Sequence, residues 1–425
     1  MSRLMGLIFF LSISLTSVYS QNDSVSLLQC FREARENAAL KPQLELISAI
    51  SKSKIENASS GNLPSLSAYG KAWYQNEAMA IDLPIPNMQG IEVNRFQYNF
   101  GVEADQKIFD GGVAGKVKEV EKASAESDKN KVETNLYQIN DRITRYFFAS
   151  LLFEESKKTL ELKLDILGKR SKEIESGVKN GIIKRSEYDK IKAEALLTEQ
   201  QLLELEKNNS QMLNALQILT GLKFSDKAIL FVPDSLMELG FASRPEYNYF
   251  DAENLKIEKS IKLKSAQNLP KFYAFGQLGY SYPGLNLFKN SADYYYIVGA
   301  KLSWTIFDWN QVKREKQILR KQEEIVKTSR DDFDQNQMIS SQDEKIEQEK
   351  LLQLIDMDKQ IIDQRAAISA SSASMLTNGI ITSAVYIDDL NAEIKARIDL
   401  ETHKIQYQNS IVKSYILNGI QLSKP

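Results

Sequence analysis

Few side chains in this sequence are of the types that usually carry out catalysis. The 425-residue chain contains one cysteine, Cys30, and one histidine, His403. One cysteine and one histidine leave almost no possibility of a nucleophile–base pair that depends on these residues. They are also too few for a Cys/His zinc site. His403 lies in a polar helical stretch, where a surface role is the ordinary one. We therefore expect no enzyme activity and no cofactor.

One glycine-rich stretch imitates a phosphate-binding loop. Residues 111–116 read GGVAGK, but three residues separate Gly111 from Gly115 where the motif needs four, and no Ser or Thr follows Lys116. The formal net charge of −2 gives no sign of a nucleic-acid partner. Function must therefore be sought in the organisation of the chain.

The first twenty residues have the pattern of a secretory signal peptide. Arg3 precedes the apolar run Leu4–Leu15, and Val18 and Ser20 suit the −3 and −1 positions of a cleavage site before Gln21. This run is too short to span a bilayer as a helix, and no later apolar run reaches 18 residues. We expect an exported protein that is periplasmic, secreted, or held in an outer membrane by strands.

The chain contains an internal repeat. The letters NGII occur at Asn180–Ile183 and again 198 residues later at Asn378–Ile381, and the same offset places Ile108–Asp110 on Ile306–Asp308. Such self-similarity indicates duplicated structural units. The predicted organisation is a signal peptide (1–20), a first repeat (21–221), a connector (222–241) and a second repeat (242–425).

Each repeat contains two strand-like stretches. In the first repeat they are about Leu66–Tyr74 and Phe96–Asp105, and in the second about Phe272–Tyr280 and Tyr294–Thr305. Apolar and polar residues alternate with period two, most clearly in the second stretch of each repeat, which predicts strands with one apolar and one polar face. On the polar face, the candidates for lining a lumen are Glu103, Asp105, Lys301 and Ser303.

Long helical hairpins are predicted after each pair of strands. Residues from Gly112 to about Glu175, and from Gln311 to about Met375, contain no proline and would form helices roughly 100 Å long at about 1.5 Å per residue. Gly181 and Gly379 then mark turns. Return helices are predicted at Ser186–Leu219 and Ala384–Leu417, and opening helices at Val25–Ser60 and Tyr247–Gln267. The predicted fold class is mainly α with β: two repeats, each a β-hairpin plus a long helical hairpin.

Four such strands cannot form a pore alone. The smallest natural barrels have about eight strands, and an open edge in lipid leaves backbone groups unpaired at several kcal/mol each. Two chains would supply eight strands, which pack solid, whereas three would supply twelve, which can leave a lumen. A pore therefore favours three copies. The alternative is a soluble protein whose two β-hairpins rest on helices.

Together these features resemble the outer-membrane efflux protein family, the TolC-like channels, over essentially the whole mature chain. The landmarks are Asn62–Pro64 before the first strand, Ile108–Gly112 after the second, Asn180–Gly181 in the turn, and the same signals in the second repeat. The resemblance implies a homotrimer whose twelve strands form an outer-membrane β-barrel, continued by a periplasmic α-helical tunnel. It also implies a passive exit duct for efflux or type I secretion, with a periplasmic adaptor (membrane fusion) protein and an inner-membrane pump as partners.

In that family, acidic residues near the hairpin turns ring the periplasmic entrance. Glu187 and Asp388 match two of these positions, but a further acidic position falls on Val385, and the position of the family's gating arginine falls on Ile381. The tip therefore departs from the family pattern. The candidates for a charged gate are Glu187, Asp189, Asp388 and Asp389.

A periplasmic adaptor with a coiled-coil hairpin, or a structural protein without a pore, is the alternative function. An adaptor would have one helical hairpin and compact β domains. Two hairpins and strands of bilayer length argue against it. The sequence does not specify the exported cargo.

Overall fold

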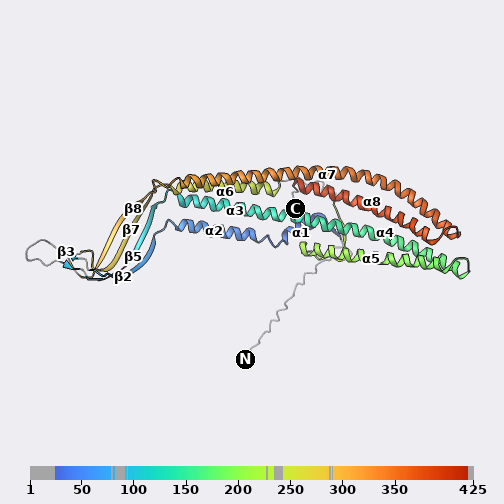
Figure 1. The fold of residues 1–425 in the computed structure, drawn as a ribbon, viewed down its shortest axis with the longest axis horizontal. Coiled ribbons are helices and arrows are strands. Elements are labelled where there is room, and N and C mark those ends of the chain that lie inside the picture. Colours follow the sequence, from blue (N-terminus) through green and yellow to red (C-terminus); the bar gives the residue numbers. More distant parts are fainter. Residues whose placement is uncertain are drawn as a thin grey trace, which may run out of the picture. The chain divides into compact units, whose positions relative to one another are not determined.

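The computed structural model describes residues 24–77, 80–81, 91–92, 94–225, 228–233, 243–286, 289 and 291–419. Contacts divide the chain into two compact units, one of Met1–Lys41, Leu136–Ala242 and Gln337–Pro425, the other of Pro42–Asn135 and Ser243–Asn336. Each unit thus takes residues from both predicted repeats (Figure 1). The predicted signal peptide and much of the predicted connector lie outside the described residues.

The second unit contains a four-stranded antiparallel sheet in the order β2-β5-β7-β8. Its strands are β2 (Ser65–Tyr74), β5 (Phe96–Phe109), β7 (Lys271–Tyr282) and β8 (Asp293–Ser303). A short ladder of β3 (Ala80–Ile81) with β4 (Ile91–Glu92) lies between β2 and β5 in the chain. The four predicted strands are confirmed, and β5 joins β7 so that the two hairpins make one sheet. Among the described residues, the outer edges of β2 and β8 have no strand partner.

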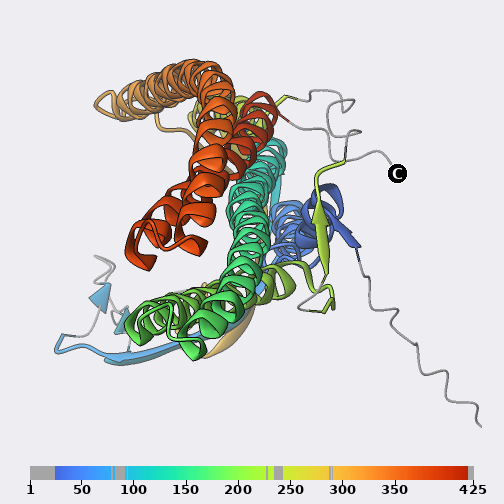
Figure 2. The same ribbon diagram turned by 90° about the vertical axis from the view of Figure 1, so that its right-hand side faces the viewer.

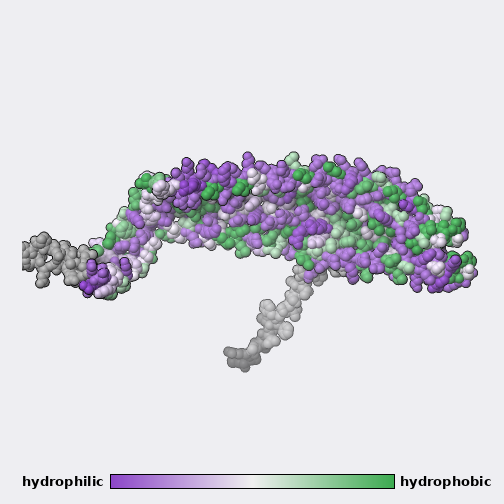
Figure 3. All heavy atoms as spheres, in the orientation of Figure 1, coloured by the Kyte–Doolittle hydropathy of each residue, from purple (hydrophilic) through white to green (hydrophobic). Residues whose placement is uncertain are grey.

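The sheet has one apolar and one mixed, more polar face. Because the register pairs odd-numbered residues with odd and even with even as far as the bulge after Lys107, each parity shares one face. The even-numbered face carries large apolar side chains at the surface, such as Tyr296 and Val298, which are 77% and 79% exposed. Figure 3 shows hydrophobic residues at the surface of the strands. The described part of the single chain therefore leaves this face uncovered.

Ion pairs connect neighbouring helices of the second unit. These helices are α2 (Gln43–Ser60), α6 (Pro245–Gln267) and the first parts of α3 (Val113–Tyr137) and α7 (Gln311–Thr377). Lys54 pairs with Glu121 across α2 and α3 at 3.0 Å, Lys259 with Glu119 across α6 and α3 at 3.2 Å, and Lys264 with Glu315 across α6 and α7 at 3.0 Å. Since these pairs are partly exposed, each contributes little by itself.

The repeated Ile-Phe-Asp motif joins a strand to a long helix in both repeats. Asp110 accepts hydrogen bonds from the N–H groups of Gly112 (2.8 Å) and Ala114 (2.7 Å), and Asp308 accepts one from the N–H of Val312 (2.9 Å). A carboxylate here satisfies free N–H groups at a helix start and complements the helix dipole. The motif therefore recurs because both long helices need the same N-terminal cap.

The first unit contains both helical hairpins. One consists of α4 (Ile139–Lys179) and α5 (Arg185–Thr220), the other of the end of α7 with α8 (Ser383–Asn418), and α4 packs against both α5 and α8 (Figure 2). In the turns, Gly181 and Gly379 have φ of +70° and +69°. The N–H of Ile182 bonds to the carbonyl of Gly177 at 2.9 Å, and that of Ile380 to Met375 at 2.9 Å. These bonds define Schellman caps, in which glycine suits the left-handed position.

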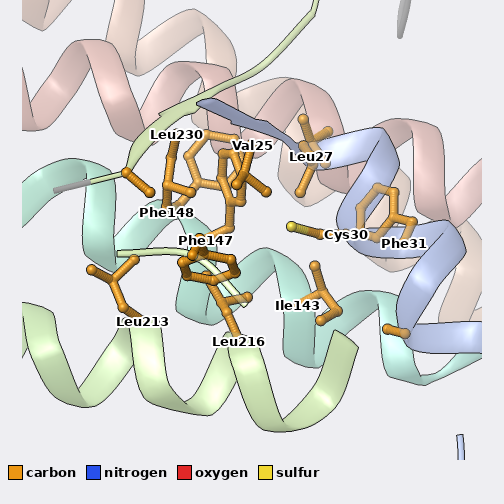
Figure 4. Close-up of a cluster of buried hydrophobic side chains, with 14 of the residues drawn as sticks. Val25, Leu27, Cys30, Phe31, Ile143, Phe147, Phe148, Leu213, Leu216 and Leu230 are labelled. Carbon is orange, nitrogen blue, oxygen red and sulfur yellow. The ribbon is translucent and has the colours of Figure 1, made fainter. Parts of the chain in front are cut away.

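A hydrophobic core in the first unit joins the hairpins to the N-terminal segment (Figure 4). The strand β1 (Ser24–Ser26) pairs in parallel with β6 (Ile229–Phe231), and α1 (Leu27–Glu36) follows. Cys30 is fully buried here, and burial raises the pKa of its thiol to about 12. The thiol of Cys30 is therefore unreactive, and its role is in packing.

The predicted continuous helix Val25–Ser60 is wrong. Val25 lies in β1, and α1 ends at Glu36 before α2 begins at Gln43. Pro42 disfavours helical geometry at the residue before it. Asn37 is the C-cap of α1, and its side-chain amide donates to the carbonyls of Ile218 and Leu219 at 3.2 and 3.3 Å.

The helix predicted from Gly112 to Glu175 is also interrupted, by a turn at Gln138 between α3 and α4. In the second repeat, β8 ends at Ser303, before Trp304 and Thr305. Within the part of the chain that the structure describes, no helix is both long and apolar enough to cross a membrane.

Candidate channel and tip sites

Near the hairpin turns, both helical hairpins share an apolar cluster. Its buried members are Leu160, Leu167, Ile174, Ile191, Leu376, Tyr386, Leu390 and Ile394. Ile183 and Ile381, which follow the two turns, are partly buried against it. Ile381, which is aligned with an arginine in the family that the sequence resembles, thus makes an apolar contact here.

Glu187 of α5 reaches the start of α8 in the other hairpin. Its carboxylate accepts the N–H of Ser383 at 2.7 Å, while Lys190 pairs with it at 3.1 Å. The N-cap residue of α8, Thr382, makes no side-chain cap bond, so Glu187 supplies the anion that this helix start favours. Burial works to raise the pKa of Glu187, but the Ser383 N–H and the Lys190 ammonium outweigh it and hold the pKa below its usual value.

The other predicted gate residues have different surroundings. Asp189 is exposed and pairs with Arg185 at 3.1 Å within α5. Asp389 accepts a hydrogen bond from Ser372 of α7, within its own hairpin. Asp388 is exposed, and its carboxylate makes no contact that we identify with the described residues. The four carboxylates therefore do not form one cluster in the single chain.

Sequence reasoning missed Arg170 of α4, which also links the hairpins. Its guanidinium donates to the hydroxyl of Thr377 at 2.7 Å, pairs with Glu173, and lies 5.4 Å from the ring centroid of Tyr386. Burial raises the pKa of the Tyr386 hydroxyl, and Arg170 opposes this shift. No local pattern marks Arg170, because Thr377 and Tyr386 lie about 200 residues further along the chain.

A buried ion pair joins three helices further from the turns. Lys163 of α4 pairs with Glu194 of α5 at 2.6 Å, and the amide of Asn391 in α8 donates to the same carboxylate at 3.1 Å. The side chains of the pair are only 5% and 14% exposed. Removing one partner would leave a buried charge without compensation, which is strongly destabilising.

All four residues predicted for the polar strand faces lie on the odd-numbered face of the sheet. Glu103 and Asp105 lie on β5 and are partly buried, and Lys301 and Ser303 lie on β8 and are exposed. Glu103 accepts a hydrogen bond from the amide of Gln277 on β7 at 2.9 Å. The carboxylates and Lys301 are on strands separated by β7, so the structure places them on one face without pairing them.

Among the described residues, no group of three or more His, Cys, Asp or Glu side chains could hold a metal ion. His403 of α8 bonds to Asp358 of α7 at 2.5 Å. This contact joins two helices of one hairpin.

Comparisons with known proteins agree with this architecture. Residues 39–222 match the family model described as outer membrane efflux protein. No curated protein matches the chain.

Solved structures match nearly the whole chain. CusC, whose structures concern transmembrane channel formation, has a TM-score of 0.70 at 14% identity, covering 95% of this chain and 96% of its own. The outer membrane protein VceC from Vibrio cholerae scores 0.66 at 13% identity, with 92% and 96% covered. The CmeC outer membrane channel from Campylobacter jejuni scores 0.64 at 14% identity, with 94% and 87% covered. At these identities the likeness shows the fold.

The family model and these neighbours describe membrane channels and outer membrane proteins, in agreement with the expectation that the chain is not an enzyme. The chain resembles the outer membrane efflux protein family, in sequence over residues 39–222 and in fold over nearly its whole length.

Proposed function

We propose that this chain is one subunit of an outer-membrane channel that acts as a passive exit duct. The observation that carries the proposal is the sheet, whose two outer edges have no strand partner within the described residues and which has an exposed apolar face and a mixed, more polar face. In lipid, such edges would leave backbone groups unpaired unless further strands joined them. Additional copies of the chain would supply those strands.

Three copies suit this role best. They would bring twelve strands, and a barrel of that size leaves a lumen where eight strands would be filled by side chains. The apolar face would then meet lipid, and Glu103, Asp105, Lys301 and Ser303 would line the lumen. The strands have ten to fourteen residues, enough for a tilted crossing of the bilayer.

The helical tip would be the periplasmic entrance of the duct. The neighbour MtrE from Neisseria gonorrhoeae, similar at a TM-score of 0.62 and 15% identity, is an outer membrane channel described in an open state. We propose that this tip also opens, when a periplasmic adaptor and an inner-membrane pump load it. Its closed state would be held by the apolar cluster around Ile381 and by Arg170 and Glu187, and Asp388 would contribute charge at the entrance.

The first experiment is the mass of the detergent-solubilised protein from membrane fractions, with bound detergent subtracted. A mass of three chains in the outer-membrane fraction is expected. If the protein is instead a single chain that is extracted without detergent, the proposed channel is contradicted. That result would favour a periplasmic helical-hairpin protein, such as an adaptor or a structural protein.

A further inference from the structure

Two tyrosines from the outer strands meet over the middle of the sheet. Tyr69 lies on β2 and Tyr295 on β8, and their hydroxyl oxygens are 2.6 Å apart. The strands β5 and β7 lie between them. With neighbouring strands about 4.8 Å apart, both side chains must lie along the sheet to meet, rather than stand away from it.

Glycines on the inner strands make this course possible. Tyr69 is directly opposite Gly101, and Tyr295 is directly opposite Gly279. A Cβ atom on Gly101 would lie 2.6 Å from the Tyr69 hydroxyl, and one on Gly279 would lie 2.6 Å from the Tyr295 ring. Each ring thus occupies the space that a side chain on the inner strand would need, a contact that also compensates for glycine in a strand.

The hydrogen bonds of this pair have a defined direction. The Tyr295 hydroxyl donates to the side-chain oxygen of Asn99 on β5 at 2.9 Å. Since a phenol has one proton, Tyr295 has none left for Tyr69. Tyr69 must therefore be the donor to Tyr295, and the two bonds form a chain from β2 through β8 to β5.

We infer that the Tyr69–Tyr295 bridge is a strap that holds the sheet concave on its odd-numbered face. A bond across this face between the outer strands resists flattening of the sheet. It also resists bending of the sheet toward the even-numbered face. On the even-numbered face, the described ring contacts Tyr98–Tyr280 and Tyr280–Tyr294 join only adjacent strands.

Strands close into a barrel only when the sheet curves. The strap therefore sets the angle at which the free edges of β2 and β8 meet those of further copies, and it selects the face that becomes the lumen. This inference rests on the proposed multi-chain channel.

The test compares hydroxyl deletions in the detergent-solubilised full-length protein. The readout is the temperature at which the multi-chain assembly dissociates into single chains, followed by mass. Tyr69→Phe and Tyr295→Phe are each expected to lower it by a few degrees. The double variant is expected to dissociate at the temperature of Tyr295→Phe alone, because Tyr295→Phe already removes the one bond that Tyr69→Phe removes. Tyr296→Phe, which removes a hydroxyl from the opposite face, is the control and should match wild type.

A second pair of variants tests the packing of the Tyr295 ring instead of the tyrosine hydroxyls. Gly279→Ala places a methyl group against the Tyr295 ring, whereas Gly276→Ala, on the same strand, meets no atom within 4 Å. The first should lower the dissociation temperature and the second should not. The strap is refuted if Tyr69→Phe and Tyr295→Phe assemblies dissociate like wild type, or if their effects add. A wild-type protein that is a single chain outside the membrane would instead refute the channel itself.

Discussion

At the scale of residues, Glu187 shows which part of a contact a sequence motif can predict and which part it cannot. The motif position predicts a carboxylate near the entrance, but its main contact is the N–H of Ser383, 196 residues away. A helix-capping bond between two hairpins leaves no local pattern, so the sequence could predict the residue and not its partner. The same holds for Arg170, which no motif marks.

We predict that Glu187→Gln loosens the tip and raises ion conductance of the channel in a planar bilayer several-fold. The change removes the negative charge at the start of α8 and weakens the bond to Ser383. Asp189→Asn is the matched control, because that carboxylate is exposed and its ion pair with Arg185 lies within α5. Equal conductance of both variants and wild type would show that Glu187 does not hold the tip.

A pH dependence follows from the same carboxylate. The pKa of Glu187 is lowered in the folded protein from the usual 4.5. The contribution of its ionised form to stability is therefore complete above about pH 4.5 and is lost as the pH falls through the folded value. Conductance of wild type should rise on acidification in that window, and Glu187→Gln should lack this step. A step of the same size in Glu187→Gln would assign it to another group.

At the scale of elements, the period-two and helical patterns predicted the four strands and the outer ends of the long helices to within a few residues, but not the interruption at Gln138. Strand alternation and uninterrupted helical patterns are local signals. The break between α1 and α2 was missed although Pro42 is a local signal for it, whereas the bond from Asn37 to the end of α5, across 181 residues, leaves no local pattern. The pairing of β5 with β7 also needed the structure, since register between two hairpins depends on distant residues.

The turn glycines allow a test of the hairpins themselves. Gly181→Ala and Gly379→Ala should each lower the free energy of unfolding by about 1 kcal/mol, because both glycines have a left-handed backbone. Gly168→Ala, inside α4 with no atom within 4 Å of the added carbon, should instead stabilise by roughly 0.5–1 kcal/mol. Thermal unfolding followed by circular dichroism measures all three. Stabilisation by the turn substitutions would contradict the left-handed caps.

At the scale of the whole molecule, α7 carries an apolar pattern that the single chain does not bury. Four isoleucines of α7 are each more than half exposed: Ile318, Ile325, Ile339 and Ile346. The first two are seven residues apart, and so are the last two. A seven-residue repeat on a helix surface is typical of contact with another helix. In the proposed channel, α7 continues from the edge strand β8, so a neighbouring copy that pairs with β8 would also lie along α7.

We predict that Ile339→Glu and Ile346→Glu together prevent stable multi-chain assembly while leaving the helix content of the chain unchanged. A carboxylate at a helix contact between copies would lose its water, which costs free energy unless a partner compensates. Gln342→Glu adds one carboxylate at an exposed position between them on α7 and should assemble like wild type. The mass of each solubilised variant, with its circular dichroism spectrum, gives the answer. Normal assembly of the double variant would place the subunit contact on another face, whereas loss of assembly in all variants would show only that added charge is not tolerated on α7.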